Sequence, residues 1–369
     1  MDGQEPLEGS GSFMKKLAIA FVFALVLQAR DATWNDLMNE GGRAFVDRRY
    51  REAENFYLQA LRQLENAPDS DLRLSGATHQ LAIVYMTECR FQEAEHAALR
   101  AIALRARIPG GGSLTAASEL VLGSIYRLTG RYSKAERITR DALSIFQREG
   151  SSEDVGVAHL SLTTVLASEY KLSEAEDTAQ QALQIWPDDQ KDRIFRSGAF
   201  HALAEIHISR RDYKKAAEYC DKALAALEAE FGPGHPRLVP VLTRRAYVEL
   251  MMKHYPEAER VARRGVDIST ATLGDQHIDT AHATIILAKA LAAQSRAVEA
   301  EPLFQSALPL LARILGSEHA VYGEALLDYA DFLRKAHRAR EAKQISEQAA
   351  LILAASRGTI DVGQLRRPS

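Results

Sequence analysis

Three histidines recur at equal spacing in the second half of the chain, and neutral histidine is a common metal ligand. His235, His277 and His319 are spaced by 42 residues. A zinc ion needs its ligand nitrogens at about 2.0–2.1 Å. Equivalent residues of stacked helical repeats are at least about 10 Å apart, because packed helices are spaced by about 8–10 Å. The spacing therefore predicts that no metal is bound and that the histidines have a structural role.

The local sequence around His235 indicates what that role is. In the stretch EFGPGHPRL, Gly232 follows the expected end of one helix, where a left-handed residue terminates helices. Pro236 suits the first turn of the next helix. We therefore expect His235 to be an N-cap residue. Two later stretches, TLGDQHIDT and ILGSEHAVY, repeat this arrangement of a glycine followed three residues later by a histidine.

Catalytic signatures are missing from the sequence. It contains no HExxH, no phosphate-binding GxxxxGK[ST], no GxSxG and no calcium-binding loop. Cys89 and Cys220 are the only cysteines, which excludes a disulfide framework or a zinc ribbon. The glycine-rich stretch at 109–113 lacks the following lysine of a phosphate loop. These observations predict a protein that is not an enzyme and uses no cofactor.

Composition points to a helical protein. The 369 residues include 46% apolar residues, enough for a large core. The 46 basic and 49 acidic side chains are interspersed, and no basic block suggests nucleic-acid binding. Alanine, leucine, glutamate and arginine are abundant, and all four favour helices. We therefore predict an all-α fold without a nucleic-acid partner.

A repeated frame runs through the chain and sets its organisation. The motif that begins YREAENFYLQAL at Tyr50 occurs in eight copies, and we call its first residue the marker position. The marker positions are residues 50, 91, 132, 172, 213, 255, 297 and 339. The intervals of 40 to 42 residues are typical of a repeat protein.

Two small residues recur in every copy of the frame. Alanine stands three residues after each marker, and alanine, or glycine at Gly265, stands ten residues after it. The seven-residue separation is close to two helical turns, so both residues share one helix face. Small side chains on that face allow a second helix to approach closely. Each copy is therefore predicted to be two antiparallel helices.

The third copy, LGSIYRLTGRYSKAERITRDAL, carries a family resemblance. Its residues resemble the tetratricopeptide repeat signature at Leu122, Gly123, Tyr126, Gly130, Tyr132, Ala135 and Ala142. The period exceeds the usual length of about 34 residues, and the glycine–histidine junctions are similar to those of the kinesin light chain variety. The resemblance covers residues 33–355. It implies a right-handed α-solenoid of about eight helix-turn-helix repeats that binds a protein or peptide.

The resemblance also implies a binding surface on the concave face, formed by the first helix of each repeat. The asparagine and lysine clamps of the family cannot be carried over, because no asparagine follows Asn66. Helical spacing predicts that the groove instead presents Gln80, Ile83, Ser124, Arg127, Thr164, His201, Glu205, Tyr247 and Lys289. Tyrosine and arginine are the residue types most often found as binding hot spots.

The N-terminus predicts export. Residues 14–29 combine a basic start with an apolar run too short to span a membrane, which is typical of a signal peptide. A buried first helix and an uncleaved anchor are the alternatives. The predicted organisation is an extension at 1–32, a solenoid at 33–355 and a tail at 356–369. We expect a scaffold or adaptor in the periplasm, cell envelope or medium. The alternative is a cytoplasmic regulator whose effector is on another chain.

Overall fold

The computed structural model describes residues 33–64, 72–187 and 192–356. All regular elements within these ranges are helices, and they form eight antiparallel pairs. The expected fold class, an all-α right-handed solenoid of about eight repeats, is confirmed. The predicted signal peptide and the tail after residue 356 lie outside the described residues. No helix within the described ranges is long and apolar enough to cross a membrane.

Each repeat consists of a first and a second helix. The first helices are residues 33–46, α3 (Leu72–Thr87), α5 (Gly112–Leu128), α7 (Ser152–Ser168), α9 (Arg193–Ser209), α11 (Val239–Met251), α13 (Ile278–Ala293) and α15 (Ala320–Lys335). The second helices are α2 (Tyr50–Arg62), α4 (Phe91–Arg105), α6 (Tyr132–Glu149), α8 (Leu172–Ile185), α10 (Tyr213–Phe231), α12 (Tyr255–Leu273), α14 (Ala297–Leu315) and α16 (Ala339–Ser356). Every second helix begins at a marker position.

The two small residues of each frame lie at the helix contacts, as predicted. All eight alanines three residues after a marker are at most 1% exposed. In the third repeat, Ala142 is 0% exposed, and the Cβ of a side chain at nearby Gly123 would come within 2.6 Å of the Thr139 hydroxyl. The helices thus approach so closely that larger side chains do not fit.

The turn inside each repeat has one recurring geometry. The residue two before each marker adopts a positive φ, although only Gly130 among the eight is a glycine. The backbone N–H of the next residue then donates to the carbonyl oxygen five residues earlier, as Arg131 does to Tyr126 and Lys171 to Leu166. This pair of features is the Schellman motif, which satisfies carbonyls at a helix end. The turn therefore reverses the chain sharply in every repeat.

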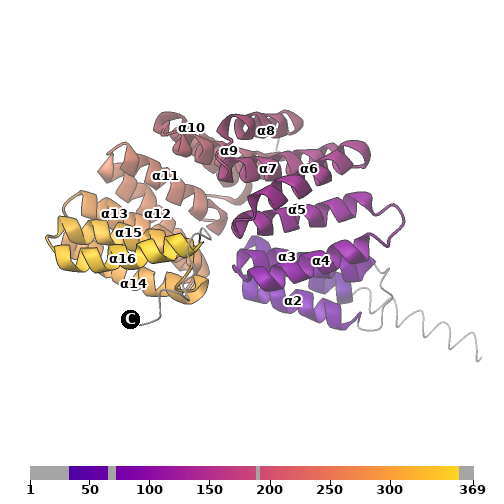
Figure 1. Ribbon diagram of the computed structural model, residues 1–369, viewed down its shortest axis with the longest axis horizontal. Coiled ribbons are helices and arrows are strands. Elements are labelled where there is room, and N and C mark those ends of the chain that lie inside the picture. The colour runs from indigo at the N-terminus through magenta and orange to yellow at the C-terminus, as the bar shows by residue number, and fades with distance from the viewer. Residues whose placement is uncertain (1–32, 65–71, 188–191, 357–369) are drawn as a thin grey trace, which may run out of the picture.

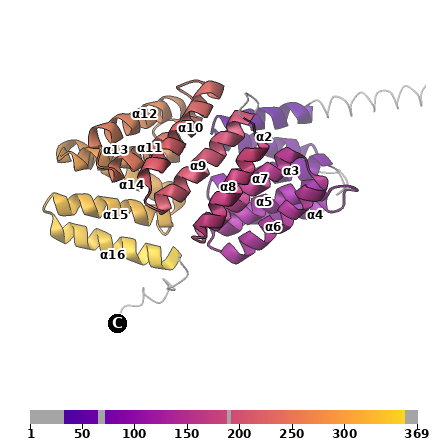
Figure 2. The same ribbon diagram turned by 90° about the horizontal axis from the view of Figure 1, so that it is seen from above.

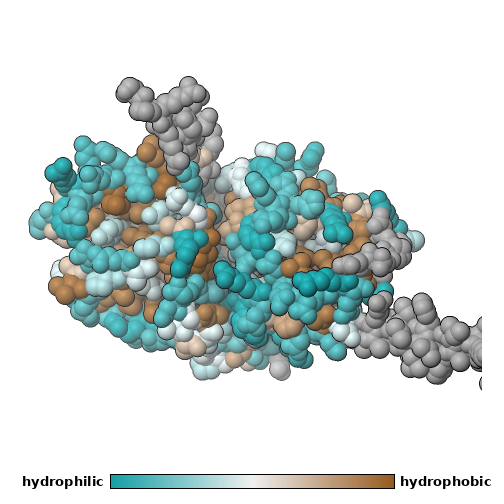
Figure 3. Space-filling model, turned by 90° about the horizontal axis from the view of Figure 1, so that it is seen from below, coloured by the Kyte–Doolittle hydropathy of each residue, from teal (hydrophilic) through white to brown (hydrophobic). Residues whose placement is uncertain are grey.

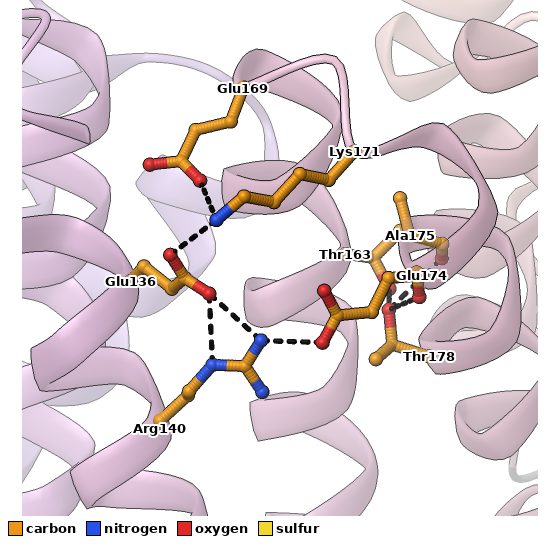
Figure 4. Close-up of polar contacts among 8 residues, drawn as sticks. All are labelled: Glu136, Arg140, Thr163, Glu169, Lys171, Glu174, Ala175 and Thr178. Carbon is orange, nitrogen blue, oxygen red and sulfur yellow. Dashed lines mark hydrogen bonds and ion pairs between the residues drawn. The ribbon is translucent and has the colours of Figure 1, made fainter. Parts of the chain in front are cut away.

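Ion pairs connect the second helices on the outside of the solenoid. In Figure 4, Glu136 of α6 accepts from Lys171 in the following turn at 2.8 Å, and Arg140 reaches Glu174 of α8 at 2.5 Å. Similar ion pairs recur between most neighbouring repeats, and we call the series that includes Glu136–Lys171 the outer ladder. Its other pairs are Glu54–Arg90, Glu95–Arg131, Glu176–Arg210, Glu259–Arg296 and Glu301–Arg338.

The outer ladder is interrupted once, between the fifth and sixth repeats. Ala217 stands where the other repeats have the glutamate, and His254 stands where most have the basic partner. His254 instead lies 2.7 Å from Glu249 of its own repeat. The fifth and sixth repeats therefore lack the ion pair of the outer ladder and are connected instead by Arg245–Asp221 and Arg264–Glu228.

The capping role of the three histidines is confirmed. Nδ1 of His235, His277 and His319 accepts a backbone N–H two residues further on, at 3.1–3.2 Å. Gly232 has a φ of 84° at the end of α10. Pro236 begins a short 3₁₀ helix, η2 (Pro236–Leu238), which leads directly into α11. The glycine and the histidine thus end one repeat and begin the next.

The repeats curve so that the two ends of the array face each other. Figure 1 shows the N-terminal and C-terminal pairs opposite one another, with α8, α9 and α10 between them. Figure 2 shows the same two halves side by side from above. The concave face is therefore enclosed on several sides.

Ala142→Trp should lower the free energy of unfolding by an amount on the order of 1–3 kcal/mol, because Ala142 fills a helix contact with no spare volume. Chemical denaturation followed by circular dichroism would measure this change. Ser144→Trp, at an exposed position of the same helix, is the matched control and should be nearly neutral. Equal effects of the two variants would contradict the predicted helix contact.

Candidate functional site

The first helices form the concave surface. Neighbouring first helices contact one another from α3 to α15, with α9 and α11 packing least closely. All nine residues predicted for the groove lie on these helices and are half-buried. The structure therefore places them together on one continuous surface, and their role in binding stays a prediction.

Charged side chains in the C-terminal half of this surface neutralise one another. Arg244 Nε lies 2.6 Å from Glu205, and Lys289 Nζ lies 2.6 Å from Asp328. Lys289 Nζ is also 5.4 Å from the centroid of the Tyr247 ring, a cation–π distance. His201 lies 3.7 Å from Glu205. This half offers an aromatic face with paired charges.

Sequence reasoning missed Arg244 and Asp328 as members of the surface. Arg244 and Asp328 each stand eleven residues before a marker position. Tyr247 and Asp331 follow one helical turn later, eight residues before the same markers. A residue eight before the marker of one repeat pairs with the residue eleven before the marker of the next, as Glu205 does with Arg244 and Lys289 with Asp328. The positions of Arg244 and Asp328 on the concave surface could therefore have been predicted from the repeat frame.

Short side chains cover the middle of the N-terminal half. Ser124 donates its hydroxyl to the carbonyl of Leu120 at 3.0 Å, and Thr164 donates to Ser161 at 2.8 Å. These hydroxyl hydrogens are used within their own helices. This part of the surface therefore presents short side chains whose hydroxyl groups already donate within the helix.

Arg127, near the end of α5, differs from the other charged groups. The side chain is half-buried, its Nε is buried without a hydrogen-bond partner, and no described carboxylate lies within ion-pairing distance. Burial lowers its pKa. A buried charge is costly unless it is paired. The side chain is therefore suited to bind an anionic group that another molecule supplies.

Two buried histidines on first helices were not predicted. Burial, assisted by the positive charge of Arg105, lowers the pKa of His79 to about 3. Burial lowers the pKa of His282 to about 4, despite the opposing effect of Asp279. His79 Nδ1 lies 3.1 Å from the Ser118 hydroxyl, which gives it a structural partner. Both rings are neutral at neutral pH.

Among the described residues, no metal site competes with this surface. Within the described ranges no three histidine, cysteine, aspartate or glutamate side chains are grouped to hold a metal ion. A shallow hollow of about 500 Å³ lies beside α12. Its arginines, Arg260, Arg263 and Arg264, each pair with a glutamate at 2.5–2.6 Å. The hollow offers no unpaired charge among these groups.

A family model described as tetratricopeptide repeat matches residues 73–148, 196–271 and 241–310, which together cover just over half of the chain. No curated protein sequence matches significantly.

Three solved structures illustrate the likeness in fold. The apo form of the quorum sensor NprR from B. thuringiensis is 10% identical, with a TM-score of 0.63 over 92% of this chain and 95% of that chain. The Rap conjugation gene regulator of the plasmid pLS20 in complex with the Phr* peptide is 13% identical, with a TM-score of 0.62 over 88% and 96%. BtubC (BKLC) from P. vanneervenii is 18% identical, with a TM-score of 0.52 over 61% and 92%.

The free energy of unfolding should decrease as the pH is lowered, because His79 and His282 resist protonation in the folded protein. Their contribution is fully present above the unfolded pKa of about 6.5 and is lost as pH falls toward about 4 for His282 and about 3 for His79. Urea unfolding across this range would measure the loss. His79→Gln with His282→Gln should flatten the profile, whereas His96→Gln, at an exposed position, should not. An unchanged profile in the double variant would contradict the assignment.

Proposed function

Because the chain belongs to the tetratricopeptide repeat family, in a long-repeat form that resembles kinesin light chains, we propose that it is a non-enzymatic scaffold or adaptor. Its partner is a peptide or protein segment bound on the concave face. The observation that carries this proposal is Arg127, a half-buried cation on that face without an acidic partner among the described residues.

The character of the surface favours an extended ligand with an acidic group. A carboxylate placed at Arg127 would form a charge-assisted hydrogen bond in a partly desolvated setting. The short side chains around Ser124 and Thr164 leave room for a peptide backbone, and Tyr247 offers an aromatic contact. The solved Rap regulator in complex with the Phr* peptide supports the proposal, since a protein of similar fold forms a complex with a peptide.

A second candidate function is a regulator that acts on an effector carried by another chain. Two proteins of similar fold, a quorum sensor and a conjugation gene regulator, favour a regulatory function. A regulator would change the activity of its effector on binding a ligand, whereas a scaffold would only bring its partners together. Activity of a copurified effector, measured with and without the peptide, distinguishes the two.

Export of the protein is a separate proposal, supported by the sequence of residues 14–29 alone. A scaffold exported by this segment would act in the periplasm, the cell envelope or the medium. Retention in the cytoplasm would favour the regulator instead.

Arg127→Ala and Tyr247→Ala should each weaken binding by at least about 1 kcal/mol, or about fivefold in Kd, without unfolding the array. A partner peptide, first identified by pull-down from native extract and mass spectrometry, would be titrated by calorimetry. Arg137→Ala and Tyr170→Ala, at exposed positions of α6 and of a turn, are the matched controls. Unchanged binding in the groove variants and loss in the controls would move the site to the outer face.

A fusion of residues 14–40 to a reporter active only outside the cytoplasm should be active. Ala18→Arg with Val22→Arg should silence it, because a charge at the centre of an inserted apolar segment costs about 2.5–3.5 kcal/mol. Reporter activity and cell fractionation would be measured together. An inactive wild-type fusion would contradict export.

A further inference from the structure

Turns of the first two repeats contact junctions of the last three repeats. The Tyr50 ring centroid lies 5.9 Å from that of His277, and the Phe91 ring centroid lies 6.4 Å from that of His319. Both aromatic residues occupy marker positions, and both histidines cap the first helix of a later repeat. The same contact is thus made twice, one repeat apart. We call these contacts, with those described next, the seam.

Polar groups complete the seam. Arg48 forms an ion pair with Asp279, and the two side chains are only 21% and 9% exposed. Asp47 lies 3.8 Å from Nε2 of the capping His235. Burial in the seam raises the pKa of Tyr50 to about 12. In the third repeat, the equivalent Tyr132 faces no histidine and is 40% exposed, so the contacts depend on position rather than on the frame alone.

The seam contains no apolar core of its own. Tyr50 packs with a cluster formed by the first repeats, whereas Ile278, beside His277, packs with a separate cluster that extends through the last repeats. No cluster of buried apolar residues in the described ranges crosses between the two sides. Apolar burial is the main favourable term in folding, so separating the seam costs far less than separating neighbouring repeats.

The connection between the fifth and sixth repeats, far from the seam along the array, differs from the others in two respects. The outer ladder is interrupted between the fifth and sixth repeats, and α9 and α11 pack less closely than other neighbouring first helices. In Figure 1, α9 and α10 lie at the top of the arch, and Figure 3 shows the two halves side by side from below. A continuous apolar core and the pairs Arg245–Asp221 and Arg264–Glu228 nevertheless join these repeats, so the seam opens through small changes of curvature distributed over the array rather than at one hinge.

We propose that the seam is a gate, which opens when the curvature of the array relaxes. Closed, the seam makes the concave face the lining of a ring; open, it admits a ligand from the side. The identity of the ligand rests on the proposed function, whereas the opening is a property of the chain alone.

Spin labels at Arg51→Cys and Asp275→Cys report the opening without a ligand. Both positions are exposed and adjoin Tyr50 and His277, and the native thiols would be replaced by Cys89→Gly and Cys220→Ala. Double electron–electron resonance should give one short distance for this chain. Arg48→Gly, which removes the guanidinium at a residue with a φ of 62°, should give a longer and broader distribution. Arg211→Gly, at a φ of 60° outside the seam, should not.

Access to the concave face provides the second measurement. A thiol at Thr164→Cys should react several-fold faster with a polymer-linked maleimide in the Arg48→Gly chain than in the Arg211→Gly chain, while a small maleimide should react equally. If Arg48→Gly does not fold, Asp279→Asn removes the same ion pair from the other side. Distances and rates unchanged by the folded seam variant would overturn the gate. A long, broad distance before any seam substitution would overturn the closed ring.

Discussion

The close approach of the two helices in each repeat is the constraint on which the rest of the structure depends. It is possible because alanine or glycine occupies two positions two turns apart, and these side chains are almost fully buried. Close packing permits few changes in volume, so the geometry of one pair is imposed on the next. The marker positions, the Schellman turns and the capping histidines then recur with the same register.

A nearly constant repeat also fixes the curvature of the array. Small rotations between neighbouring repeats add up along a solenoid, and seven repeats are enough to bring Arg48 to Asp279. The ring is therefore a consequence of repeat geometry, which the seam contacts complete. The same curvature gathers Arg127, Tyr247 and the paired charges of the C-terminal half onto one inner surface. Structure and candidate function thus have one cause.

Features that depend on one repeat could be predicted from the sequence. The buried alanines, the helix starting at each marker and the His235 cap follow from local spacing and were found. Features that depend on the path of the whole array could not. Neither the contact of Tyr50 with His277 nor the pairing of Lys289 with Asp328 follows from the period, because each requires the angle between repeats. The histidines were correctly read as caps, and their contacts with the first repeats came only from the structure.

Small-angle X-ray scattering of the purified protein tests the central claim that the repeats form a closed array. The account predicts a scattering curve that agrees with the closed arrangement of residues 33–356, with a pair-distance distribution that ends at the width of the ring. An extended distribution, with a maximum distance typical of an open superhelix, would contradict it.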